Sequence, residues 1–104
     1  MSADVTLPIR IEGTPSLDWS RLILSGRVTV ADAGELHRVA IALASRGHGV
    51  TVDCSEAEYL DTSAVQVLLA LGRVLDRGGH PCDIVGASAV LSEDFRLTGY
   101  TGVR

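Results

Sequence analysis

The chain has 104 residues, of which 46% are hydrophobic and 21% charged, a composition typical of one small globular domain. Nine arginines face thirteen acidic residues, which gives a formal net charge of -4 and argues against a nucleic-acid surface. The longest apolar runs fall far short of the roughly 20 residues of a membrane helix, and the N-terminus lacks the pattern of a signal peptide. We therefore expect a single domain over residues 1–104, located in the cytoplasm, with no membrane insertion.

The N-terminal part of the chain predicts an antiparallel hairpin at the edge of a sheet. Val5 to Ile11 is rich in β-branched residues and contains Pro8, which cannot donate to a ladder and therefore suits an edge strand. After a turn over 13–18, Arg21 to Leu24 forms a second short apolar run, which Ser25-Gly26 ends.

The next segments predict a helix followed by a buried strand. Apolar residues recur at helical spacing from Ala33 to Leu43, behind a plausible N-cap at Thr29, which predicts an amphipathic helix over about 31–46. Val50 to Val52 then forms a short apolar strand. Because a helix leads directly into this strand, we expect it to join a parallel sheet.

An acidic stretch comes next. Residues 53–61 hold four carboxylates and no arginine, whereas the rest of the chain has nine acidic residues and nine arginines, so the whole net charge falls here. We interpret the stretch as a short acidic loop. It leads through Asp61-Thr62-Ser63 into a second helix over about 63–77, and hydroxyl groups at a helix N-terminus suit either capping or an anion.

The second helix is apolar around most of its circumference, so it is either deeply covered or presents an apolar face to a partner. Pro81 to Val85 predicts the next strand, and Ser88 can cap a last helix that Gly99 closes. The order ββαβαβα predicts an α/β domain with one mixed, mostly parallel sheet, an antiparallel edge hairpin and about three helices.

Taken together, these segments resemble the STAS domain, the fold of the anti-sigma factor antagonists of bacterial partner-switching pathways. The resemblance spans about residues 20–100 in one register and is carried by Gly49–Asp53, Tyr59–Ser63, the apolar helix to Leu75, Arg77–Gly79, Asp83–Gly86 and Leu97–Gly99. It implies a non-enzymatic signalling module of transcription regulation, without cofactor or metal. In the family pattern Asp61 matches the aspartate, Thr62 the first hydroxyl, and Ser63 the residue that a cognate kinase phosphorylates, with Thr62 as the alternative acceptor.

The residues after the hydroxyls depart from the common pattern, because Ala64-Val65-Gln66 replaces Gly-Leu-Gly. This form is more similar to small STAS proteins of chemotaxis and other two-component operons. It also has some likeness to the STAS subunit of bacterial lipid-transport ATPases. The implied partner is therefore an anti-sigma factor or serine kinase, or a two-component signalling protein. The alternative is a constitutive subunit of a larger complex such as a lipid-transport ATPase, without phosphorylation.

We expect the partner to contact the helix start and the acidic stretch, at Asp53, Glu56, Glu58, Asp61, Thr62, Ser63, Ala64, Val65 and Gln66. The alternative is that the two hydroxyls only cap the helix and the carboxylates form a solvated loop. An exposed apolar helix face would also allow a homodimer.

An enzyme is the competing class, with Cys54 as a nucleophile and His48 or His80 as its base. Cysteine is among the most buried residues, and no spacing here orients a base. The two cysteines form no CxxC pair, and the histidines show no HExxH pattern, so we expect free thiols, no catalytic residue and no metal site.

Overall fold

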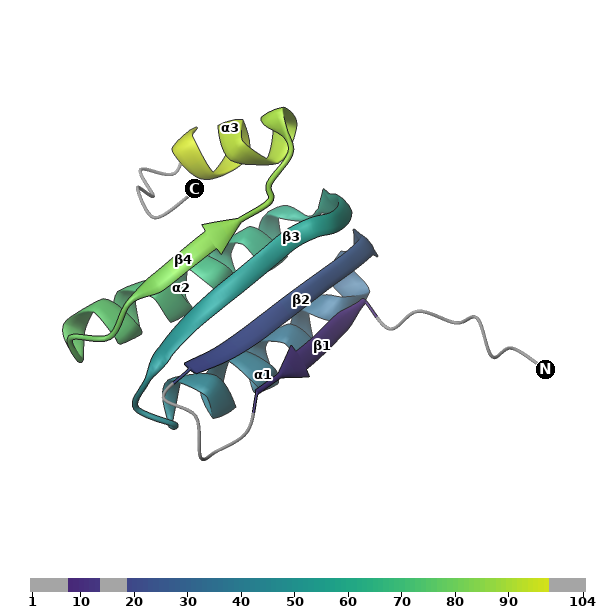
Figure 1. Ribbon diagram of the computed structural model, residues 1–104. Coiled ribbons are helices and arrows are strands. Elements are labelled where there is room, and N and C mark those ends of the chain that lie inside the picture. Colours follow the sequence, from purple (N-terminus) through teal and green to yellow (C-terminus); the bar gives the residue numbers. More distant parts are fainter. Residues whose placement is uncertain (1–7, 14–18, 98–104) are drawn as a thin grey trace.

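The computed structural model describes residues 8–13 and 19–97 and shows a four-stranded sheet with two long helices against one face (Figure 1). The elements are β1 (Ile9–Glu12), β2 (Trp19–Val28), the 3-10 turn η1 (Val30–Asp32), α1 (Ala33–Ala44), β3 (Gly49–Leu60), α2 (Thr62–Arg77), β4 (Cys82–Val85) and α3 (Ala89–Leu97). The predicted order ββαβαβα is confirmed.

The sheet is mixed, as predicted, with the strand order β1-β2-β3-β4. β1 pairs antiparallel with β2 and forms the edge hairpin, while β2–β3 and β3–β4 are parallel pairs. The expected start of the first strand, at residues 5–7, and most of the expected turn lie outside the described residues. Figure 1 shows α1 and α2 side by side behind the sheet, with α3 beyond β4.

Two of the strands are longer than the sequence predicted. β2 continues past Ser25-Gly26 to Val28, and β3 continues past Asp53 to Leu60, so residues 54–60 are strand and the prediction of a loop there is wrong. The reason lies in the register, which shifts between Ile23 and Ser25 of β2 and again between Gly26 and Arg27. At each shift β3 contains one residue more than β2, and such β-bulges break the alternation by which a strand is recognised in a sequence.

The core lies between the sheet and the helices, and it accounts for the apolar character of α2. Seven residues of this helix are buried, at Ala64, Val65, Leu68, Leu69, Leu71, Gly72 and Leu75. They pack with buried residues of the other elements, which include Leu22 and Leu24 of β2, Val50 and Val52 of β3, Ile84 of β4, Leu36 and Leu43 of α1, and Leu91 and Phe95 of α3. Most of α2 is therefore covered by its own domain, and Val74 is its large exposed hydrophobic residue.

Truncation of Leu68 should measure the contribution of this core. Leu68 is fully buried in α2, so Leu68→Ala should lower the free energy of unfolding by about 2–5 kcal/mol through lost burial and the cavity left behind. Val74→Ala in the same helix is the matched control, because Val74 is 49% exposed. Urea denaturation of both variants gives the comparison, and equal losses would contradict the placement of Leu68.

Candidate functional site

The start of α2 is organised by Asp61, which is the N-cap of the helix. Its backbone is extended, with φ -64° and ψ 154°, and its side chain accepts a hydrogen bond from the Ser63 N–H at 2.9 Å. The Ser63 hydroxyl donates to the same carboxylate oxygen, with 2.5 Å between Oγ and Oδ2. The interpretation of Thr62 and Ser63 as the capping residues is therefore wrong, since the helix includes both of them and a carboxylate caps it.

The position of Asp61 is fixed by the sheet. Its N–H donates to the carbonyl oxygen of Val28 at the end of β2, at 2.9 Å, and its own carbonyl accepts the first helical hydrogen bond from Val65 at 3.0 Å. The carboxyl ends of two parallel strands thus hold the residue that orients Ser63.

The hydrogen bonds to Asp61 also set its charge. The Ser63 hydroxyl and then the Ser63 N–H lower the pKa of Asp61 below its usual value, with a smaller contribution from the Tyr59 hydroxyl, whose oxygen lies 3.3 Å from Oδ1. Asp61 is therefore ionised at neutral pH. Since an ionised carboxylate only accepts hydrogen bonds, the Ser63 proton points at Asp61.

Around this contact lie residues that the sequence did not indicate as partner-binding residues. The Arg27 guanidinium lies 4.7 Å from the centre of the Tyr59 ring, a cation–π contact between the ends of β2 and β3. Val30 in η1, next to α2, is 69% exposed. The signal that could have found Arg27 and Tyr59 is their place at the ends of neighbouring parallel strands, which meet at one edge of the sheet.

We call these residues the helix-start surface: Arg27, Val30, Tyr59, Asp61, Thr62, Ser63 and Gln66. Thr62 and Gln66 are exposed and Ser63 is half-buried. In contrast, Ala64 and Val65 are 0% and 5% exposed and belong to the core. Their side chains are thus not available to a partner in this conformation.

The four carboxylates of the acidic stretch do not form one negative surface. Asp53 accepts from Arg21 of β2 at 2.6 Å, and Glu56 forms an ion pair with Arg10 of β1 at 3.2 Å. The prediction that the whole net charge lies at the helix start is therefore wrong. Arginines that are distant in the sequence neutralise half of the cluster across the sheet, which leaves Glu58, exposed within β3, and Asp61 near the helix start.

Asp53 has a structural role within this network. Hydrogen bonds from Ser55, whose N–H lies 2.8 Å from Oδ1, and then the contact with Arg21 lower the pKa of Asp53 to about 2, although burial opposes the change. Asp53 is 8% exposed. It therefore ties β2 to the first bulge of β3.

Protonation of Asp53 should cost stability in acid. An unfolded Asp titrates near pH 3.9, so the ionised form stabilises the fold above that pH, by about 2 kcal/mol, and this contribution is lost as the pH falls towards 2. Asp53→Asn keeps an acceptor for Ser55 but cannot titrate. Urea denaturation between pH 5 and pH 2 should show a steeper loss for the wild type than for Asp53→Asn. Glu56→Gln, with an exposed ion pair, is the control, and parallel pH profiles for wild type and Asp53→Asn would contradict this role.

The residues considered for an enzyme do not come together. Cys54 is 1% exposed, and burial, followed by the charge of Asp53, raises the pKa of its thiol to about 12. The ring of His48 is hydrogen-bonded to Ser20 Oγ at 2.7 Å, at the start of β3, while His80 follows α2. Neither cysteine forms a disulfide, and in the described part of the chain no three His, Cys, Asp or Glu side chains converge as a metal site would require.

The chain belongs to the STAS domain family, because the sequence model of that family matches residues 16–104. Its description reads "Mlab, STAS domain". The resemblance seen in the sequence is thus confirmed. No curated protein matches the chain.

Solved structures share the fold at low sequence identity. The unphosphorylated form of the anti-sigma factor antagonist SpoIIAA is 12% identical, with a TM-score of 0.78 over 92% of this chain and 86% of that chain. The phosphorylated form of the Bacillus cell fate determinant SpoIIAA is 14% identical, with a TM-score of 0.75 over 88% of this chain and 83% of that chain. A putative anti-sigma factor antagonist from Thermotoga maritima is 13% identical, with a TM-score of 0.73 over 92% of this chain and 83% of that chain.

The same fold also occurs inside a much larger protein. The murine anion transporter Slc26a9 is 15% identical, with a TM-score of 0.64 over 83% of this chain and only 16% of the transporter chain. Within the described residues of the present chain, no helix has the length and apolar character needed to span a membrane.

The bond between Ser63 and Asp61 can be tested by titration. In Ser63→Ala the hydroxyl donor is lost while the backbone N–H remains, so the pKa of Asp61 should rise towards its ordinary value. Carboxyl carbon shifts in an NMR pH titration measure this change. Thr62→Ala is the control and should leave the pKa of Asp61 unchanged. An unchanged Asp61 pKa in Ser63→Ala would contradict the hydrogen bond.

Proposed function

We propose that this protein is a signalling module that binds a partner protein through the helix-start surface, and that phosphorylation of Ser63 switches this binding. The observation that carries the proposal is the double contact of Asp61 with Ser63, from the hydroxyl at 2.5 Å and from the N–H at 2.9 Å. It holds a serine hydroxyl in one orientation at the start of a helix. In this scheme the partner kinase supplies the catalytic machinery, and Thr62 stands as the alternative acceptor.

A phosphate on Ser63 would change the site in two ways. It would replace the hydroxyl proton that Asp61 now accepts, and it would add about -1.5 to -2 charges beside an ionised carboxylate. The helix N-terminus stabilises such an anion by only about 0.3–1 kcal/mol. Repulsion from Asp61 and desolvation in any interface closed over the phosphate exceed that gain, so binding should weaken.

The unphosphorylated helix-start surface has the character of a protein interface. Tyr59 is 37% exposed with Arg27 against its ring, and Val30 is 69% exposed. Tyrosine and arginine are enriched in protein interfaces and among the residues that contribute most to binding. SpoIIAA, which shares the fold, has been solved in unphosphorylated and phosphorylated forms, and this supports phosphorylation of the present chain. We infer as the partner an anti-sigma factor or serine kinase, or a two-component signalling protein.

A second candidate is a constitutive STAS subunit of a larger complex such as a lipid-transport ATPase, without phosphorylation. Two observations favour it: the family description names Mlab, and Ala64 replaces the glycine of the common phosphorylated pattern. The two candidates differ in the phosphate occupancy of Ser63.

The first experiment is phosphosite mapping of the protein recovered from its own host, with and without phosphatase treatment, together with identification of the co-purifying proteins. Phosphate on Ser63, and a kinase-like partner retained mainly after phosphatase treatment, are expected for the switch. A bare Ser63 under all growth conditions, with a stable ATPase partner, would favour the constitutive subunit.

With the partner in hand, Ser63→Asp should weaken binding by about tenfold or more, because a loss of 1.4 kcal/mol corresponds to that factor. Ser63→Ala should bind as the unphosphorylated protein does and should no longer respond to the kinase. Ser45→Asp is the matched control and should leave binding unchanged, since it makes the same substitution at an exposed serine at the C-terminal end of α1, outside the helix-start surface. Calorimetry measures all three, and equal affinity of Ser63→Asp and wild type would refute the switch.

A further inference from the structure

Among the described residues, no strand pairs with the outer edge of β1. Ser25 N–H donates to the Pro8 carbonyl at 2.9 Å, and the register pairs Arg10 with Ile23 and Glu12 with Arg21. Because an antiparallel ladder alternates, the N–H and C=O groups of Arg10 and Glu12 face β2, while those of Ile9 and Ile11 face outward. In the part of the chain that the structure describes, β1 is an end strand of the sheet. Such an edge is a template for another strand.

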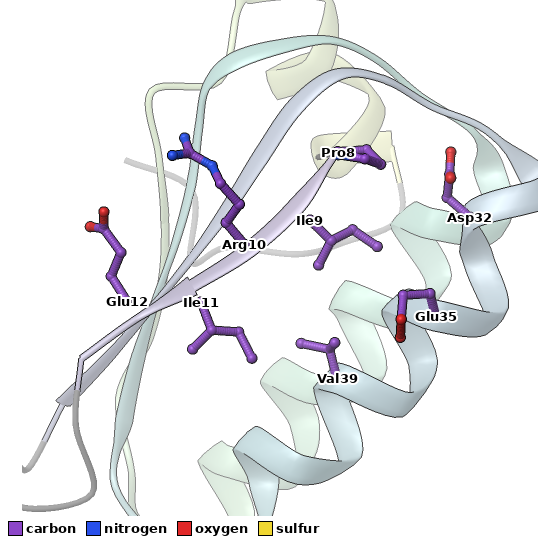
Figure 2. A pocket seen from close by; sticks show the side chains of 8 residues that line it. All are labelled: Pro8, Ile9, Arg10, Ile11, Glu12, Asp32, Glu35 and Val39. Atoms are coloured by element: carbon purple, nitrogen blue, oxygen red, sulfur yellow. The ribbon is translucent and has the colours of Figure 1, made fainter. Parts of the chain in front are cut away.

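A groove runs beside this edge, between β1 and α1. Its volume is about 560 Å³, and it is lined by Pro8, Ile9, Arg10, Ile11, Glu12, Asp32, Glu35 and Val39. Figure 2 shows Ile9 and Ile11 pointing towards Val39 of α1, while Arg10 and Glu12 point away from the helix. Ile11 is 38% exposed. The edge therefore combines free hydrogen-bonding groups with an apolar side and a charged side.

The charges on this strand are complementary to themselves. Around Ile11 the sequence reads Arg10-Ile11-Glu12, so a second copy running antiparallel, with Ile11 opposite Ile11, brings each Arg10 opposite a Glu12. Directly opposite charges stabilise a strand pair, whereas like charges destabilise it. Two other two-fold registers within β1 match the outward backbone groups. Centring the pair on Arg10 would place the two Arg10 side chains together, and centring it on Ile9 would place each Arg10 opposite Pro8, so neither register forms these pairs.

We propose that the β1 edge is a homodimer interface, in which two copies pair antiparallel about Ile11 and continue the sheet across a two-fold axis. The two Ile11 residues then exchange both backbone hydrogen bonds. On the charged side each Arg10, which already pairs with Glu56 of its own chain, also lies opposite the partner's Glu12. Ile9, Ile11 and Val39 of both copies cover the groove on the apolar side. This interface differs from the helix surface through which dimerisation was expected, and it is independent of Ser63, whose helix follows β3, two strands away from β1.

A charge-swap experiment on the full-length chain tests the interface. Sedimentation velocity should show a wild-type dimer whose fraction grows with micromolar concentration. Arg10→Glu and Glu12→Arg each replace two attractive pairs by two repulsive ones, so each variant alone should dimerise about tenfold more weakly or worse. An equimolar mixture should recover dimers of wild-type strength, because each pair then joins an arginine to a glutamate again. General damage to the fold could not produce this recovery.

Two further variants complete the design. Arg73→Glu reverses an exposed charge on α2 and should leave the dimer unchanged. Ile11→Pro removes an N–H that faces outward, so it should abolish the dimer while circular dichroism shows an intact fold. A wild-type chain that stays monomeric to about 1 mM, or a dimer unaffected by both charge reversals, would overturn the interface. If the equimolar mixture does not recover dimers, the Ile11-centred register is wrong. The β1 edge would then accept an extended segment of another protein instead.

Discussion

One carboxylate oxygen of Asp61 serves both the helix and the hydroxyl beside it. Oδ2 accepts from the N–H and from the Oγ of Ser63, so the same contact ends the strand, begins α2 and points a serine proton in one direction. The position of Asp61 depends in turn on β3 and on its hydrogen bond to Val28 of β2. A chemical change at Ser63 is therefore felt first by the group that anchors the helix. This coupling gives a small modification a local structural consequence, besides its charge.

The elements that the sequence predicted well were those whose signal is local. Helical spacing indicated α1 within two residues at each end, over 31–46 against Ala33–Ala44, and α2 within one residue at its start. The edge hairpin followed from Pro8 and the turn, and the family resemblance singled out Asp61 and Ser63, which hydrogen bonds join in the structure. What could not be predicted depends on pairing between strands. Arg21 contacts Asp53 across 32 residues of sequence, and Arg10 contacts Glu56 across 46 residues. The sequence alone therefore could not indicate that these charges neutralise each other.

The fold of this domain occurs in proteins of different kinds. Proteins at 12–15% identity share this fold as free-standing anti-sigma factor antagonists and as a part of a much longer anion transporter. The sheet and its two long helices therefore form a scaffold that is compatible with different partners. Under the proposed function, the choice of partner belongs to exposed side chains near the ends of β2 and β3, such as Arg27, Val30 and Tyr59, which the core does not constrain.

Because β3 contains two bulges, the number of residues between Asp53 and Leu60 determines how the end of the strand is placed. Each bulge adds one residue against β2, and together they bring Leu60 into the core and Asp61 to the edge. Because side chains alternate along a strand, one deletion in this segment would turn Leu60 towards solvent and carry Asp61 away from the helix. A substitution at the exposed Glu58 would keep this number of residues and therefore the register. The segment thus acts as a spacer of fixed length, and the number of its residues, rather than their charge, sets the position of Ser63.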